Sequence, residues 1–203
     1  AKEALARLID ELAAEYPDSH ELGQLALEMV VRQSHLAMQI ELDRIAKMDD
    51  AGERGRRLQD LIADFAINVC EESGFRGYLA PKIYTLGWND FVAHAAVGLV
   101  WGAWHLAFLS FVLSYTTEDV PTLVPRFLVA TVAASIVYGE IRLLTDSVWP
   151  AVLMQTTGGA LLGALLLGRF VQVDDRTAFL FSPGIEGTLM IALAVALGVA
   201  IHL

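Results

Sequence analysis

Hydrophobic positions divide the chain into an amphipathic first part and a strongly apolar remainder. In the segment 2–16, apolar residues recur at helical spacing between charged ones, at Leu5, Leu8, Ile9 and Leu12. A break at 17–19 is followed by a second striped segment that ends near Met48. We therefore predict an acidic amphipathic helical hairpin in the region 1–60, whose second helix ends near Met48 and is followed by a polar connector at 49–57. We expect the hairpin to be a soluble cap, since a helix that lies on a membrane surface usually has a basic polar face.

Four long apolar segments follow in the second part, at 91–113, 126–144, 149–168 and 187–203. The first contains no Lys, Arg, Asp or Glu, and about 20 apolar residues suffice to cross a bilayer as a helix. None of the segments alternates with the two-residue period of a membrane β-barrel. The pattern predicts an all-α fold, a polytopic membrane helical bundle, with a membrane-embedded core over residues 61–203.

Composition supports this interpretation and excludes other classes. The chain is 55% hydrophobic and 19% charged, whereas soluble domains average about 45–50% and about 25%. A net charge of −10 without a basic tract excludes nucleic acid as a partner. The single cysteine, Cys70, excludes an internal disulfide and a cysteine-rich zinc site. We expect an integral, multi-pass protein of the cell membrane that contacts the lipid bilayer.

Charged residues occur where the apolar part begins, in the half-apolar segment 61–83. Glu72 and Arg76 are four residues apart, so on a helix they share a face and neutralise each other. Glu71 points about 100° away and has no such partner. One interpretation is an ordinary cluster of ion pairs at the membrane interface. The other is that Glu71, in an apolar pocket, acts as a general base near neutral pH.

Histidine in an apolar segment favours the second interpretation. His105 lies in the middle of the segment 91–113, one turn after Trp101. A lone histidine there can be a packing residue or a bridge between helices. With Glu71 on a neighbouring helix, however, carboxylate and imidazole could bind and activate one water. We expect His94 to be an interface histidine. Glu140 is expected to anchor its helix at the interface, or to approach Arg76 or the entrance.

Three motifs resemble the CPBP family of intramembrane proteases, which includes CAAX-type prenyl-protein endopeptidases and bacteriocin-processing or self-immunity proteins. They are EESGFRGYL at 71–79, GLVWGAWHLAF at 98–108 and SVWPAVLMQ at 147–155. The resemblance implies a glutamate-dependent hydrolase in which Glu71 and His105 activate water, while Glu72 and Arg76 form a supporting pair. It implies neither cofactor nor metal. Zinc is the second choice, because two ligands make a weak metal site.

The third motif departs from the family pattern of a histidine and an asparagine four residues later. Gln155 stands at the histidine position and Gly159 at the asparagine position. Gln155 keeps an amide N–H that can act as an oxyanion donor, or it can form a hydrogen bond between helices. Gly159 has no side chain, and with Gly163 it could allow close helix packing.

The resemblance implies an intramembrane endopeptidase that cleaves a membrane-associated peptide or a prenylated protein. The altered third motif favours an alternative, a weakened or inactive member that serves as a membrane scaffold, regulator or immunity protein. A transporter with a proton relay ranks last, because inverted repeats are not evident. Family members usually have spans before the glutamate motif, so a partner could supply additional helices here.

Overall fold

The computed structural model describes residues 32, 35, 36, 38–106, 119–167, 177–182 and 184–202. Within these ranges the chain forms helices joined by turns and contains no strand, which confirms the all-α prediction for this part of the protein. Residues 38–46 are helical, as predicted for the end of the second striped segment. The predicted helix at 2–16 lies outside the described residues. The labelled elements are α3 (Ala51–Glu72), η1 (Ser73–Leu79), α4 (Ala80–Tyr84), α5 (Asp90–Leu106), α7 (Val120–Thr145), α8 (Trp149–Leu167), α9 (Ala178–Phe181) and α10 (Thr188–His202).

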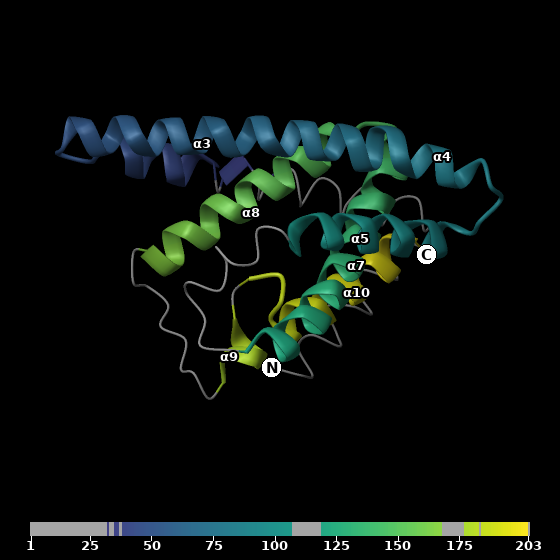
Figure 1. Ribbon diagram of the computed structural model, residues 1–203. Coiled ribbons are helices and arrows are strands. Elements are labelled where there is room, and N and C mark those ends of the chain that lie inside the picture. The colour runs from purple at the N-terminus through teal and green to yellow at the C-terminus, as the bar shows by residue number, and fades with distance from the viewer. Residues whose placement is uncertain are drawn as a thin grey trace, which may run out of the picture.

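A long rod of helix, made of α3, the π-helix η1 and α4, runs along one side of the molecule (Figure 1). Its start corrects the predicted connector at 49–57, because residues from Ala51 onward are helical. The side chain of Asp50 accepts a hydrogen bond of 2.7 Å from the backbone N–H of Glu53, and such a cap stabilises a helix start by about 1 kcal/mol. The predicted boundary at residue 60 falls inside this continuous helix.

The other helices are organised around α7. Both α5 and α10 pack along α7, while α8 packs against α3. Glycines allow the closest approach between α5 and α7: a Cβ atom on Gly98 would lie 2.7 Å from the Cα atom of Val132. Gly102, one turn further along α5, would meet Thr131 of α7. A small residue at every fourth position is the usual way for two helices in a membrane to pack closely.

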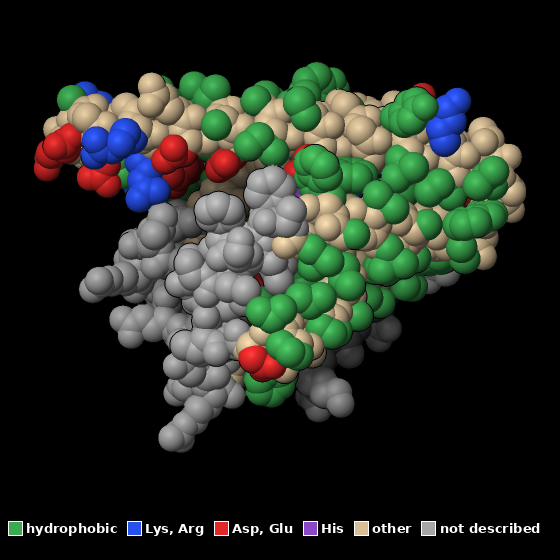
Figure 2. Space-filling model, viewed as in Figure 1, with side chains coloured by type: hydrophobic (Ala, Val, Ile, Leu, Met, Phe, Trp, Pro, Cys, Tyr) green, Lys and Arg blue, Asp and Glu red, His purple; other side chains and the backbone are tan. Residues whose placement is uncertain are grey.

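One helix of the described part, α7, is long and apolar enough to cross a membrane. The helix α10 is apolar but shorter. The predicted span 91–113 corresponds to α5 as far as Leu106, and its remainder lies outside the described residues. In Figure 2, hydrophobic side chains cover much of the surface around α5, whereas charged side chains gather at the start of α3. Large hydrophobic residues exposed on α5 include Val92, Leu99, Val100 and Trp104.

Candidate active site

Three helices meet at the carboxylate of Glu71. Glu71 lies at the end of α3, Trp101 on α5 and Gln155 on α8. The Oε2 atom of Glu71 accepts a hydrogen bond of 3.1 Å from the indole Nε1–H of Trp101. The same oxygen accepts a bond of 2.9 Å from the Nε2 amide of Gln155. One carboxylate oxygen is therefore held by two neutral N–H donors from two different helices.

His105 faces the other oxygen of this carboxylate. Its Nε2 atom lies 3.6 Å from the Oε1 atom of Glu71, and its Nδ1 atom lies 2.9 Å from the carbonyl oxygen of Trp101. A carbonyl oxygen can only accept, so Nδ1 carries the proton and donates. In the neutral form of the imidazole, this leaves the lone pair of Nε2 directed at Glu71. Side-chain exposures of 28% for His105 and 12% for Glu71 leave both groups partly accessible.

Glu72 and Arg76 form the ion pair that their spacing predicts. The Nη1 atom of Arg76 donates to Oε1 of Glu72 over 2.7 Å, and both side chains are fully buried. The guanidinium carbon lies 4.6 Å from the ring centre of Trp101 and 5.0 Å from that of Tyr138. Arg76 is thus compensated by one carboxylate and two aromatic rings.

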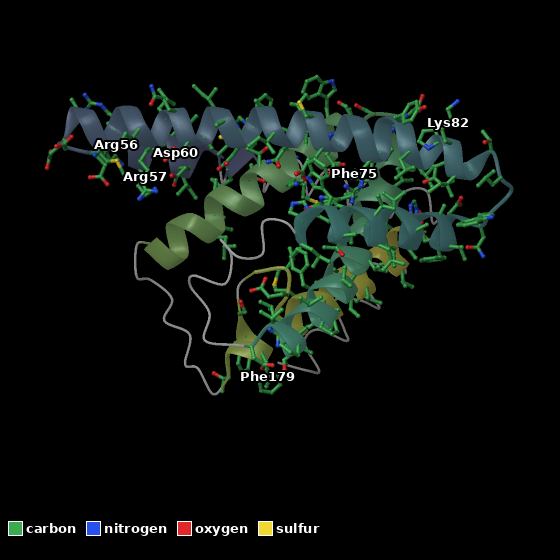
Figure 3. The ribbon with its side chains drawn as sticks, in the orientation of Figure 1. Arg56, Arg57, Asp60, Phe75, Lys82 and Phe179 are labelled. Carbon is green, nitrogen blue, oxygen red and sulfur yellow. The ribbon has the colours of Figure 1, made fainter. Side chains whose placement is uncertain are left out.

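The helix geometry changes directly after the two glutamates. Residues Ser73–Leu79 form a π-helix, in which the backbone N–H of Ala80 donates to the carbonyl of Phe75, five residues earlier. Such wide turns are rare and often occur at functional sites. Figure 3 shows Phe75 in this region, far along the rod from Arg56, Arg57 and Asp60 at the other end of α3. The functional groups therefore gather at one end of α3.

Several buried polar atoms around this carboxylate cluster have no hydrogen-bond partner in the described part of the protein. They are Oε2 of Glu72, Nε and Nη2 of Arg76, Oγ of Ser135 and Oε1 of Gln155. Buried polar atoms without protein partners are common binding positions of ordered water. The chemistry of the cluster is therefore suited to hold solvent beside Glu71.

The five side chains predicted as a site thus lie together. His105 and Gln155 meet the carboxylate of Glu71. The pair of Glu72 and Arg76 adjoins them through the contact of Arg76 with the ring of Trp101. Gly159 does not take part in the close helix packing that its spacing suggested: a Cβ atom there would meet no described atom within 4 Å. On the same helix, Thr156 accepts a hydrogen bond of 3.0 Å from Asn68 of α3.

His94 and Glu140, which were expected at the membrane interface, are both buried within the protein and lie together. The Nε2 atom of His94 lies 3.1 Å from Oε1 of Glu140, and Nδ1 of His202 lies 2.9 Å from the same oxygen. The hydroxyl of Tyr84 lies 3.3 Å from Nδ1 of His94. These mutual hydrogen bonds allow the polar groups to be buried among apolar helices. Sequence spacing alone could not reveal pairs so far apart.

Sequence reasoning missed two contributions to the site. The motif identified Trp101 only as an aromatic residue, but its indole N–H binds Glu71. None of the three motifs includes Tyr138 of α7, although its ring faces Arg76. The signal for Tyr138 in the sequence was its position, two residues before Glu140 in a largely apolar segment. Among the described residues, no group of three or more His, Cys, Asp or Glu side chains is arranged to hold a metal ion.

Comparison with known proteins identifies one family. The family model for type II CAAX prenyl endopeptidases, Rce1-like, matches residues 58–161. This range runs from α3 into α8 and includes Glu71, His105, Gln155 and Gly159. No curated protein and no solved structure matches the chain.

Proposed function

Because this chain belongs to the Rce1-like family of type II CAAX prenyl endopeptidases, we propose that it is a membrane-bound endopeptidase whose Glu71 and His105 jointly activate water. The family is membrane-bound, and its name implies prenylated proteins as substrates in general. For this chain we propose a prenylated protein or another membrane-associated peptide, cleaved beside the bilayer in a multi-pass helical bundle.

One observation carries the proposal, the 3.6 Å separation between Oε1 of Glu71 and Nε2 of His105. With the proton of His105 on Nδ1, both atoms are acceptors. Two acceptors that face each other need a proton donor between them, unless the imidazole is itself protonated. A water can donate one hydrogen to each, which leaves its lone pairs free for attack on a carbonyl carbon. This arrangement favours hydrolysis over a purely structural role.

The proposed reaction requires only groups of this chain and water. The water oxygen attacks the peptide carbonyl carbon while one water proton passes to Oε1 of Glu71. The carbonyl oxygen becomes an oxyanion, and the carbon–nitrogen bond then breaks as Glu71 returns the proton to the leaving amine. Since an amide nitrogen carries two N–H groups, Gln155 can hold Glu71 with one and stabilise the oxyanion with the other. No metal ion is needed for these steps.

The test is cleavage of a prenylated, membrane-tethered peptide by the purified protein in lipid vesicles. We expect turnover by the unchanged protein, and a loss of at least about a hundredfold in Glu71→Gln and in His105→Ala. Asp60→Asn is the matched control, because it replaces an exposed carboxylate on the same helix by an amide. Equal turnover in all four proteins would contradict the assignment of Glu71 and His105.

A second candidate is a member with weakened or no activity that acts as a membrane scaffold, regulator or immunity protein. The observation in its favour is Gly159, which supplies no donor at the third motif. Loss of one oxyanion donor typically costs about 10²–10³ in turnover. The open surroundings of Gly159 leave room for a side chain, so the double variant Gln155→His, Gly159→Asn is feasible. Cleavage gained only in this variant would favour the second candidate, whereas strong cleavage by the unchanged protein would exclude it.

A further inference from the structure

Trp101 contacts three of the predicted site residues, Glu71, Arg76 and His105. It is buried, with 4% of its surface exposed, and lies on α5 between the other elements of the site. Three different parts of this one residue meet three charged or titratable groups. The indole N–H meets Glu71, the ring meets Arg76, and the backbone carbonyl meets His105.

The indole N–H determines which oxygen of Glu71 faces His105. An indole nitrogen is a donor only, and when it is buried it needs an acceptor. Its acceptor is Oε2 of Glu71, which also accepts from Gln155. Since Oε2 is occupied by two donors, the carboxylate presents Oε1 to the imidazole.

The carbonyl and the ring of Trp101 fix the two neighbours of that carboxylate. Its carbonyl accepts from Nδ1 of His105, which sets the tautomer of the imidazole and directs Nε2 toward Glu71. The two rings also contact each other edge to face, with centres 5.4 Å apart. On its other side, the indole ring lies 4.6 Å from the guanidinium of Arg76.

We propose that Trp101 is the positioning residue of the site, which sets the orientation of Glu71 and His105 toward one another through its indole N–H and its carbonyl. Phenylalanine could provide the ring and the carbonyl, but only tryptophan among the apolar aromatic residues also provides an N–H donor. The proposal rests on the proposed hydrolase function for its kinetic consequence. Its structural part stands on the contact between Trp101 and Glu71 and can be tested without a substrate.

The substrate-free test uses the indole N–H signals in a ¹⁵N spectrum of the protein in detergent micelles. The chain has four tryptophans, and Trp101→Phe assigns the signal of Trp101 by its disappearance. We expect this N–H to exchange slowly with solvent, because it is buried and donates to Glu71. In Glu71→Gln the signal should move and its exchange should become faster, because an amide replaces the carboxylate acceptor. A Trp101 signal that exchanges rapidly in the unchanged protein, or that keeps its position and exchange rate in Glu71→Gln, would overturn the proposal whether or not the protein is active.

The kinetic test separates positioning from packing. Trp101→Phe keeps an aromatic ring, and replacement of Trp101 by benzothienylalanine keeps the bicyclic shape with sulfur in place of N–H. Loss of a hydrogen bond to a charged group corresponds to a fall in kcat on the order of ten- to a hundredfold. We expect this fall in both variants with an unchanged KM, because a positioning residue acts on the reacting groups and not on substrate binding. Trp88→Phe, at an exposed position after α4, is the matched control.

The outcomes distinguish this proposal from the proposed function. An inactive unchanged protein whose Trp101 N–H signal responds to Glu71→Gln would support the positioning role and contradict the hydrolase. An active protein whose benzothienylalanine variant keeps the same kcat would support the hydrolase and overturn the positioning role. If Trp101→Phe fails to fold, the benzothienylalanine variant provides the same comparison without a change of shape.

Discussion

Arg76 shows how a single buried charge is accommodated at this site. Its guanidinium is fully buried, and the carboxylate of Glu72 lies 2.7 Å away. Two aromatic rings, those of Trp101 and Tyr138, supply further favourable contacts. An isolated charge is very costly to bury. Removal of either Glu72 or Arg76 therefore leaves the other charge buried without a partner. We therefore expect the two residues to be strongly coupled in stability.

Glu72→Ala should lower the free energy of unfolding by about 3–5 kcal/mol, because it leaves the guanidinium of Arg76 buried without its counter-ion. The double variant Glu72→Ala, Arg76→Met should be more stable than Glu72→Ala alone, since no uncompensated charge remains. Thermal unfolding of the purified proteins in detergent measures both effects. Additive losses from the two substitutions would show that the pair is not coupled.

At this scale, the sequence predicted the partners that are close along the chain. The spacing of Glu72 and Arg76 predicted their pairing, because residues four apart on a helix are neighbours. The donors to Glu71 come from residues 30 and 84 positions away, and such contacts depend on how helices pack. For the same reason the pairing of His94 with Glu140 was not foreseen.

At the scale of elements, the contact between α5 and α7 determines where Trp101 and His105 lie. Gly98 and Gly102 bring α5 against α7 on the face next to Trp101. The apolar pattern of both segments predicted helices, and their composition predicted that they are buried or in lipid. The pattern did not reveal the α5 glycines as the contact, and it suggested Gly159 of α8 instead. The sequence alone does not show whether the backbone of another helix lies beside a given glycine.

Gly98→Ala should destabilise the protein by about 1–3 kcal/mol, because the added Cβ atom meets the backbone of Val132 and α5 must shift. Gly55→Ala is the matched control, since a Cβ atom at that exposed helix position meets no atom within 4 Å. There, alanine should stabilise the helix by about 0.5–1 kcal/mol. Unfolding curves of the two variants give the comparison, and equal stability of both would refute the close contact between α5 and α7.

At the scale of the whole molecule, a second polar cluster joins four helices. Tyr84 of α4, His94 of α5, Glu140 of α7 and His202 of α10 form one chain of hydrogen bonds. This cluster fixes the C-terminal helix on α7, next to the apolar contacts of Ile201 with Val137 and Ile141. The sequence predicted the helical bundle but not which helices meet, since its apolar segments resemble one another.

Glu140→Leu should loosen α10, because it removes the acceptor shared by His94 and His202. Loss of a hydrogen bond to a charged group costs about 1.5–3 kcal/mol. In this variant, hydrogen–deuterium exchange should therefore become faster in α10 than it is in the unchanged protein, while exchange in α3 should stay the same. Asp146→Asn is the control: it removes the charge of an exposed carboxylate that pairs with Arg142, and exposed pairs contribute about 0–1 kcal/mol. Unchanged protection of α10 in Glu140→Leu would contradict this account of how the bundle is held.

The central claim is that Glu71 and His105 act on one and the same water. The most direct measurement is kcat for a prenylated peptide in a double-mutant cycle of Glu71→Gln, His105→Ala and the combined variant. Groups that act as a unit are not additive in their effects, so we predict that the combined variant is no slower than the slower single variant. Losses that multiply in the combined variant would mean that the two residues act independently, and a shared water would be ruled out.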